Sequence, residues 1–108
     1  MRTKTITINP LPVKVKLISG SREEVKAKLK YHIDESSEGA VIPYNDKMYI
    51  WINPDNSQDE IINYCIHESV HVINRSLEYI GQGLDFQDDE IYAYLVSELS
   101  MKLYKFFT

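Results

Sequence analysis

Residues 65–71 read Cys-Ile-His-Glu-Ser-Val-His and lie inside a longer segment, 57–80, whose apolar residues recur with helical spacing. Successive residues of an α-helix advance by about 100° and about 1.5 Å, so side chains four positions apart stand above one another. His67 and His71 can therefore reach one tetrahedral Zn²⁺ ion without bending the backbone. Glu68 projects from a neighbouring face, toward a water molecule on such an ion. The spacing predicts two zinc ligands and a base on one helix.

The same segment carries the signals for the helix itself. Ser57, followed three residues later by Glu60, is a capping box that satisfies free backbone N–H groups of the first turn. The expected buried positions, spaced by threes and fours, are Ile62, Ile66, Ser69, Ile73, Leu77 and Ile80. The histidines belong to a different, more polar face, together with Tyr64 and Arg75.

Strands are expected near the N-terminus. Residues 4–19 carry two stretches in which apolar and polar residues alternate, which is typical of strands with one buried face. Pro10 and Pro12 interrupt the alternation, so the better strand is expected over 13–18.

A second capping box, Ser21 with Glu24, opens a shorter helix after Gly20. The expected inner positions of this helix are Val25, Leu29 and Ile33. His32 lies beside them and has no metal-type spacing to a neighbour. We expect it to be a packed or surface histidine rather than a ligand.

A β-hairpin is expected over 40–44 and 47–52, because Asn45-Asp46 between these apolar runs tolerates the positive φ of a tight turn. Pro43 indicates that the first of these strands has a free edge or is irregular. Alternate residues of the second strand face opposite sides: Tyr49 and Trp51 one, Met48, Ile50 and Ile52 the other.

The last helix is expected from Asp88 or Asp89 to Tyr104 or beyond. Its apolar positions are Ile91, Leu95, Leu99 and Leu103, with Tyr92, Val96 and Phe106 broadening that side. These elements predict one domain, 1–108, with an α+β fold. A small antiparallel or mixed sheet, built from the N-terminal strand and the hairpin, packs on three helices.

Composition narrows the function classes. The apolar fraction of 44% and the charged fraction of 26% are those of an ordinary globular protein. A net charge of −4 favours neither nucleic acid nor an anionic membrane as partner. The chain has one cysteine, Cys65, expected as a small buried hydrophobe, so no internal disulfide forms. With no secretory signal and no membrane-spanning run, a cytoplasmic location is expected.

A third metal ligand is expected from the acidic cluster Asp88-Asp89-Glu90. From His71 to the end of its helix is about nine residues, or roughly 14 Å, and seven or eight loop residues can span about 23 Å. The chain can therefore return antiparallel and bring the last helix level with His71. Glu90 shares a face with Ala93, whose small side chain would let the two helices approach closely.

His67-Glu68-x-x-His71, followed after eighteen residues by Glu90-x-x-Ala93, resembles the gluzincin zinc metallopeptidases. The order of strand, helix, hairpin, histidine helix and glutamate helix is also similar to the minimal zincin-like core. The resemblance implies that His67, His71 and Glu90 hold Zn²⁺ and that Glu68 is the catalytic base. It also implies a peptide or protein substrate. An extended peptide is then expected to pair with the strand 47–52 along the cleft.

Several alternatives remain open within the resemblance. Asp85 is the next candidate for the third ligand, and Asn74 and Leu77 stand where the metzincin pattern has glycine and histidine. Larger gluzincins often carry an acid four residues after the ligand glutamate, where this chain has Tyr94. The candidates for stabilising the oxyanion are Tyr44, Tyr92 and Tyr94.

Two functions of a different class compete with peptidase activity. One is a binding or regulatory module that keeps the zincin core with weak or no turnover. The other is a metal-free helical interaction protein that forms a homodimer through its hairpin and its aromatic tail, residues 104–108.

Overall fold

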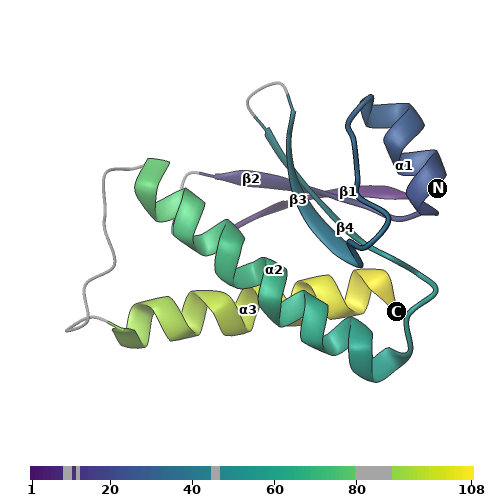
Figure 1. Cartoon of the computed structure of the whole chain (residues 1–108). Helices are drawn as coiled ribbons and strands as arrows, with labels where there is room; N and C mark the ends of the chain where they lie inside the picture. Colours follow the sequence, from purple (N-terminus) through teal and green to yellow (C-terminus); the bar gives the residue numbers. More distant parts are fainter. Residues whose placement is uncertain (9–10, 12, 45–46, 80–88) are drawn as a thin grey trace.

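The computed structural model describes residues 1–108 apart from 9–10, 12, 45–46 and 80–88. Its elements in chain order are β1 (Thr3–Thr7), β2 (Lys14–Ile18), α1 (Arg22–Leu29), β3 (Gly39–Tyr44), β4 (Lys47–Ile52), α2 (Gln58–Tyr79) and α3 (Asp89–Phe107). The strands form one sheet, with α1 on one face and α2 and α3 on the other (Figure 1). The predicted α+β class is confirmed, and the sheet is mixed. The predicted turn at Asn45-Asp46 lies outside the described residues.

The strand order is β1-β2-β4-β3. β1 pairs with β2 and β3 with β4, both antiparallel, while β2 and β4 run parallel with Leu17 opposite Ile50. A parallel pair needs a crossover, and the segment that contains α1 supplies it. Because β4 lies between two strands, the expectation that Lys47–Ile52 lines a cleft and pairs with a peptide is wrong. The edge strands are β1 and β3, and Pro43 correctly indicates the edge position of β3.

β4 is buried on both faces, and its alternation is confirmed. Tyr49 and Trp51 pack with α1, and Ile50 and Ile52 pack with α2 and α3. A strand covered on both sides carries an almost unbroken apolar run, as β4 does. The Trp51 indole N–H donates to the carbonyl of Gly20 at 2.8 Å, so the polar atom of this buried ring is satisfied.

Capping sets the helix starts as predicted. The Glu24 N–H donates to Ser21 Oγ at 3.2 Å, and the Glu60 N–H donates to Ser57 Oγ at 3.3 Å. α1 ends at Leu29, because the next residue, Lys30, adopts a left-handed φ of 50°. Ile33 is buried as expected, but it lies beyond the helix. His32 is exposed, as a surface histidine.

The buried face of α2 overlaps the predicted one only in part. Ser69 and Ile73 are buried as predicted, and Leu77 packs partly buried against the core. Ile62 and Ile66 are 38% and 46% exposed, so their placement in the core is wrong. The predicted position Ile80 lies outside the described residues. The buried residues of this helix are Ile61, Cys65, Glu68, Ser69, Val72, Ile73 and Ser76. The buried position of Cys65 is confirmed. Apolar residues stand side by side at 61–62 and 65–66, so two adjacent faces carry a helical spacing, and the sheet takes the first.

α3 follows its predicted stripe except at the start. Leu95, Leu99 and Leu103 are buried, whereas Ile91 is 59% exposed, so its place in the core is wrong. Phe106 is buried in the same core, and its carbonyl accepts a hydrogen bond from the Arg2 guanidinium at 3.0 Å. The aromatic tail therefore packs on its own chain.

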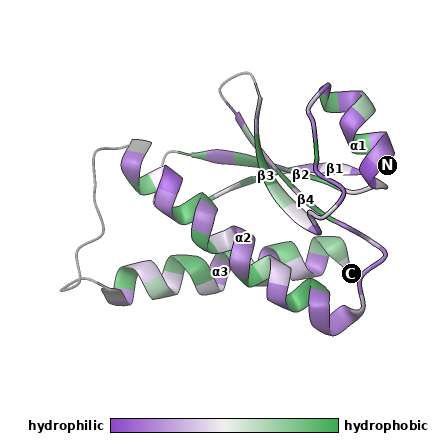
Figure 2. Ribbon diagram, in the orientation of Figure 1, coloured by the Kyte–Doolittle hydropathy of each residue, from purple (hydrophilic) through white to green (hydrophobic). Residues whose placement is uncertain are grey.

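Both long helices are amphipathic, and Figure 2 shows hydrophilic and hydrophobic residues alternating along them. Among the helices within the described ranges, none combines the length and the apolarity that crossing a bilayer requires. The polar side of α2 is the side that carries the histidines.

Candidate functional site

His67 and His71 lie one turn apart on the exposed face of α2. Their Nε2 atoms are 3.2 Å apart. Two imidazole nitrogens that each lie about 2.0–2.1 Å from a tetrahedral Zn²⁺ ion stand about 3.3 Å from one another. The pair therefore has the separation that two ligands of one zinc ion need. Without metal, the same separation lets one neutral imidazole donate to the other.

Glu68 lies beside His67, in the contact between α2 and β3, and only 5% of it is exposed. A Cβ atom on Gly39 would lie 3.5 Å from Glu68 Oε1, so the glycine leaves room for the carboxylate against the strand. Glu68 Oε1 is 4.0 Å from His67 Nε2. Burial raises the pKa of the Glu68 carboxyl, while the nearby His67 and Arg75 oppose the rise. A carboxyl with a raised pKa beside a histidine pair is better suited to accept and release a proton than an ordinary carboxylate is.

The free edge of β3 passes beside this carboxylate. The Asn53 N–H donates to the Glu38 carbonyl at 2.8 Å, and hydrogen-bonded and non-bonded pairs alternate from there along the antiparallel ladder. The backbone groups of Gly39, Val41 and Pro43 therefore point away from β4, toward the open edge. Proline at such a position costs the sheet no hydrogen bond.

Arg75 also reaches this edge. One of its terminal nitrogens, Nη1, donates to the Val41 carbonyl at 3.5 Å. Arg75 follows Glu68 by seven residues, which is two helical turns, so both side chains lie on the same face. Neither Arg75 nor Gly39 has a role in the prediction from sequence. The seven-residue spacing could have identified Arg75, whereas the approach of Gly39 to Glu68 depends on the tertiary fold.

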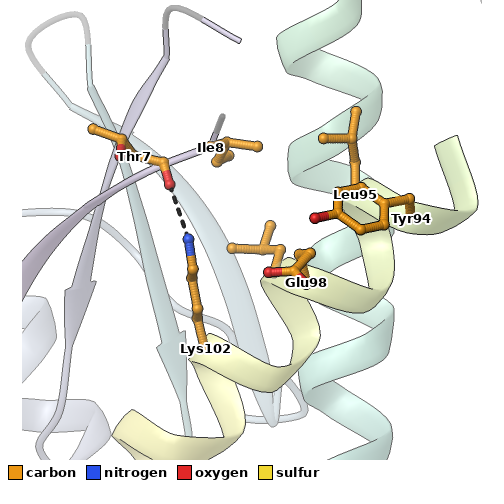
Figure 3. A pocket seen from close by; sticks show the side chains of 7 residues that line it. Thr7, Ile8, Tyr94, Leu95, Glu98 and Lys102 are labelled. Carbon is orange, nitrogen blue, oxygen red and sulfur yellow. Dashed lines mark hydrogen bonds between the residues drawn. The ribbon is translucent and has the colours of Figure 1, made fainter. Parts of the chain in front are cut away.

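A hollow of about 200 Å³ lies next to the histidines and is lined by Glu60, Asn63, Tyr64 and His67. A second groove, of about 160 Å³, lies between the end of β1 and α3 (Figure 3). Its lining includes Tyr94, Glu98 and Lys102, and no histidine. Only the first hollow therefore adjoins the imidazole pair.

The structure does not gather the predicted third ligand with the histidines. Glu90 is exposed in the first part of α3, and Ala93 is exposed rather than placed between the helices. Within the ranges described, no group of three or more His, Cys, Asp and Glu side chains stands close enough to hold a metal ion. Asp85 lies outside these ranges.

The predicted tyrosines fall in three situations. Tyr94 is 60% exposed and lines the groove at the β1 edge, where Figure 3 shows it near Glu98. Tyr92 is partly buried against the core of α2 and α3. The side chain of Tyr44 lies outside the described part of the chain. The site as described thus consists of His67, His71 and Glu68 beside the β3 edge.

Comparisons with known proteins add nothing to this geometry: scans against family models, curated proteins and solved structures each returned no match.

Proposed function

We propose that the protein is a zinc-dependent peptidase with a zincin-like core. The observation that carries the proposal is the pair of imidazole nitrogens, 3.2 Å apart, beside a buried glutamate. This geometry suits two ligands of one zinc ion and a base next to them. We also propose a cytoplasmic location, where the lone thiol of Cys65 stays reduced.

In this proposal, the two histidines hold the metal and the glutamate transfers the proton. A zinc ion held by His67 and His71 would polarise the scissile carbonyl and lower the pKa of a bound water molecule. Glu68 accepts a proton from the attacking water and passes it to the leaving amine. Its burial favours this role, because a raised pKa makes the carboxylate a stronger base for the proton of the water molecule.

The β3 edge is suited to hold the substrate. An extended peptide that adds to this edge would pair with the outward-facing groups of Gly39 and Val41. Gly39 lies against Glu68, so the peptide backbone would pass close to the base. The hollow next to His67 has room for one side chain of that peptide.

The main test of the proposal is Glu68→Gln. We expect the variant to bind zinc like the wild type and to lose about a thousandfold or more in peptide cleavage, because it cannot accept the proton. Glu78→Gln, an exposed change on the same helix, is the matched control and should leave cleavage unchanged. Equal cleavage by wild type and Glu68→Gln would remove the assigned base.

The assignment of Glu90 as third ligand has its own test. We expect Glu90→Gln to weaken zinc binding by about tenfold or more, measured by competition with a chromophoric chelator, because it removes one anionic donor. Glu98→Gln, two turns further along α3, should leave the affinity unchanged. If both variants bind zinc like the wild type, Glu90 is not a ligand.

A second candidate function is favoured by one observation. The described residues gather no group of three ligands, which would suit a binding module with a weak metal site or none. Purified protein that binds peptides with stoichiometric zinc, and cleaves none of a broad library, would establish this second function and exclude the first.

A further inference from the structure

Two side chains of α2 meet the β3 edge at different points. Glu68 packs at Gly39, and the Arg75 guanidinium reaches Val41. These contact points, Gly39 and Val41, are two residues apart on β3, which corresponds to about 6.7 Å along the strand. The same distance spans about two residues of an extended peptide that adds to this edge.

The Arg75 side chain is exposed, and most of its hydrogen-bonding capacity is unused within the described residues. Its one hydrogen bond there is the 3.5 Å contact with the Val41 carbonyl, at the long limit for such a bond. It forms no ion pair with any described carboxylate. A guanidinium carries five N–H donors in a planar fork that matches a carboxylate in two parallel bonds.

The contact matters because the Val41 carbonyl is one of the groups that an added strand would use. A peptide on this edge meets the guanidinium before it can pair beyond Val41. A neutral peptide would have to displace the arginine at the cost of its hydrogen bond. A peptide with a carboxylate at this point would instead replace a long bond to a carbonyl by a short bidentate ion pair.

We infer that Arg75 selects peptides that carry a carboxylate about two residues from the bond to be cleaved. The carboxylate can belong to an aspartate or glutamate side chain, or to the terminus of the peptide. This inference rests on the proposed peptidase function, because the distance is counted from Glu68 as the base. Arg75 is then a specificity-determining residue rather than a catalytic one.

The simpler role for Arg75 is to shield an open strand edge. Lys102 does the same at the other edge, where its Nζ donates to the Thr7 carbonyl at 3.4 Å. A shielding residue would have no preference for charge in the substrate. The experiment therefore measures preference, with Lys102→Gln as the matched control.

The probes are fluorescent ten-residue peptides that contain one cleavable bond and a single Glu. The Glu is placed in turn at every position on both sides of that bond. A second series carries Gln at the same positions for comparison. A further pair ends in a free carboxylate or an amide. For the wild type and Lys102→Gln, we expect kcat/KM to be about tenfold to a hundredfold higher when the carboxylate lies about two residues from the cleavable bond. Arg75→Gln should lose this preference, and Arg75→Glu should favour Lys at the same position. Whether the Glu series or the free terminus shows the effect identifies the source of the carboxylate.

Binding to zinc-loaded Glu68→Gln, measured by fluorescence anisotropy, separates failure of the inference from failure of the proposed function. Carboxylate-dependent binding that Arg75→Gln abolishes, without cleavage by the wild type, would support Arg75 and refute the peptidase. Cleavage with equal rates for Glu and Gln peptides would refute the role of Arg75 and leave the peptidase intact. A carboxylate preference that persists in Arg75→Gln, or no carboxylate dependence in either binding or cleavage, overturns the inference.

Discussion

The two edges of the sheet are built alike and differ in their surroundings. Backbone groups point outward at Val41 on β3 and at Thr7 on β1, and each carbonyl accepts one hydrogen bond from a cationic side chain of a helix. The distances are 3.5 Å from Arg75 and 3.4 Å from Lys102. The backbone geometry alone therefore does not distinguish a functional edge from an inert one.

The two edges differ in the charged and reactive side chains that lie along them. An open hollow along β1 is lined by Arg2, Lys4 and Lys105, and cationic side chains of this kind keep other strands from pairing with an edge. On the β3 edge, Gly39 has no side chain, and the carboxylate of Glu68 lies directly beside this glycine. The β1 edge is therefore protected by cationic side chains, while β3 is left open where the base stands.

The strongest contrast between the two edges should come from removing one outward N–H on each. Val41→Pro deletes such a donor from β3, and Thr5→Pro is the matched change on β1. The Ser19 N–H donates to the Arg2 carbonyl, so the alternation along β1 makes the Thr5 N–H point outward as well. Neither N–H belongs to the ladder. We expect Val41→Pro to lower kcat/KM for peptides about tenfold to a hundredfold, because the substrate loses a backbone hydrogen bond and its path along the edge.

Thr5→Pro should keep the wild-type rate, and both variants should remain folded by circular dichroism. Equal losses in the two variants would mean that proline acts through the sheet as a whole. No loss in either would mean that substrates do not add to β3.

Local patterns in the sequence were sufficient for the elements of this fold. Alternation identified the strands, and the Ser21–Glu24 and Ser57–Glu60 pairs identified two helix starts, because capping depends on residues three apart. Pro43 correctly indicated an edge position for β3. The expectation that a peptide pairs with strand 47–52 was wrong, because strand order depends on where the chain crosses the sheet.

The candidate site could likewise be predicted from the sequence only in part. The separation of His67 and His71 follows from the helix itself, so it could be predicted from a four-residue spacing. The position of Glu90 depends on the angle between α2 and α3 and on residues 80–88, which lie outside the described structure. The burial of Glu68 depends on a glycine in a distant strand, which the sequence does not link to the helix.

Glu68→Gln should also change how the stability of the metal-free protein depends on pH. Burial raises the pKa of Glu68, so the folded chain holds this proton more tightly than the unfolded chain does. That stabilisation is fully present below the ordinary value of 4.5 and is lost as the pH rises through the raised pKa. We expect Glu68→Gln to be more stable than the wild type at pH 8 and equally stable at acid pH, because only the wild type loses the bound proton as the pH rises. Urea unfolding at both pH values measures this, and a difference independent of pH would contradict it.

A smaller change in stability is expected from a substitution at the β1 edge. Lys102→Met removes the long hydrogen bond to Thr7 and one cation near β1. We expect the free energy of unfolding to change by less than about 0.5 kcal/mol, since exposed polar contacts contribute little. Self-association at high protein concentration should increase, because the edge loses a charge that opposes pairing. Sedimentation of Lys102→Met beside Glu98→Gln tests this, and identical profiles would show that the lysine does not guard the edge.

The smallest expected effect is that of Gly39→Ala. The new Cβ would lie 3.4 Å from the Trp51 carbonyl oxygen and 3.5 Å from Glu68 Oε1, which are ordinary van der Waals contacts. We expect the plateau value of kcat/KM to stay within about threefold of the wild type. The methyl group would exclude water from the Glu68 carboxylate, so the pKa of this group should rise further. The acid limb of the pH–rate profile would then move to higher pH. An unmoved acid limb would mean that the titrating group is not the carboxylate beside Gly39, and the β3 edge would lose its link to the chemistry.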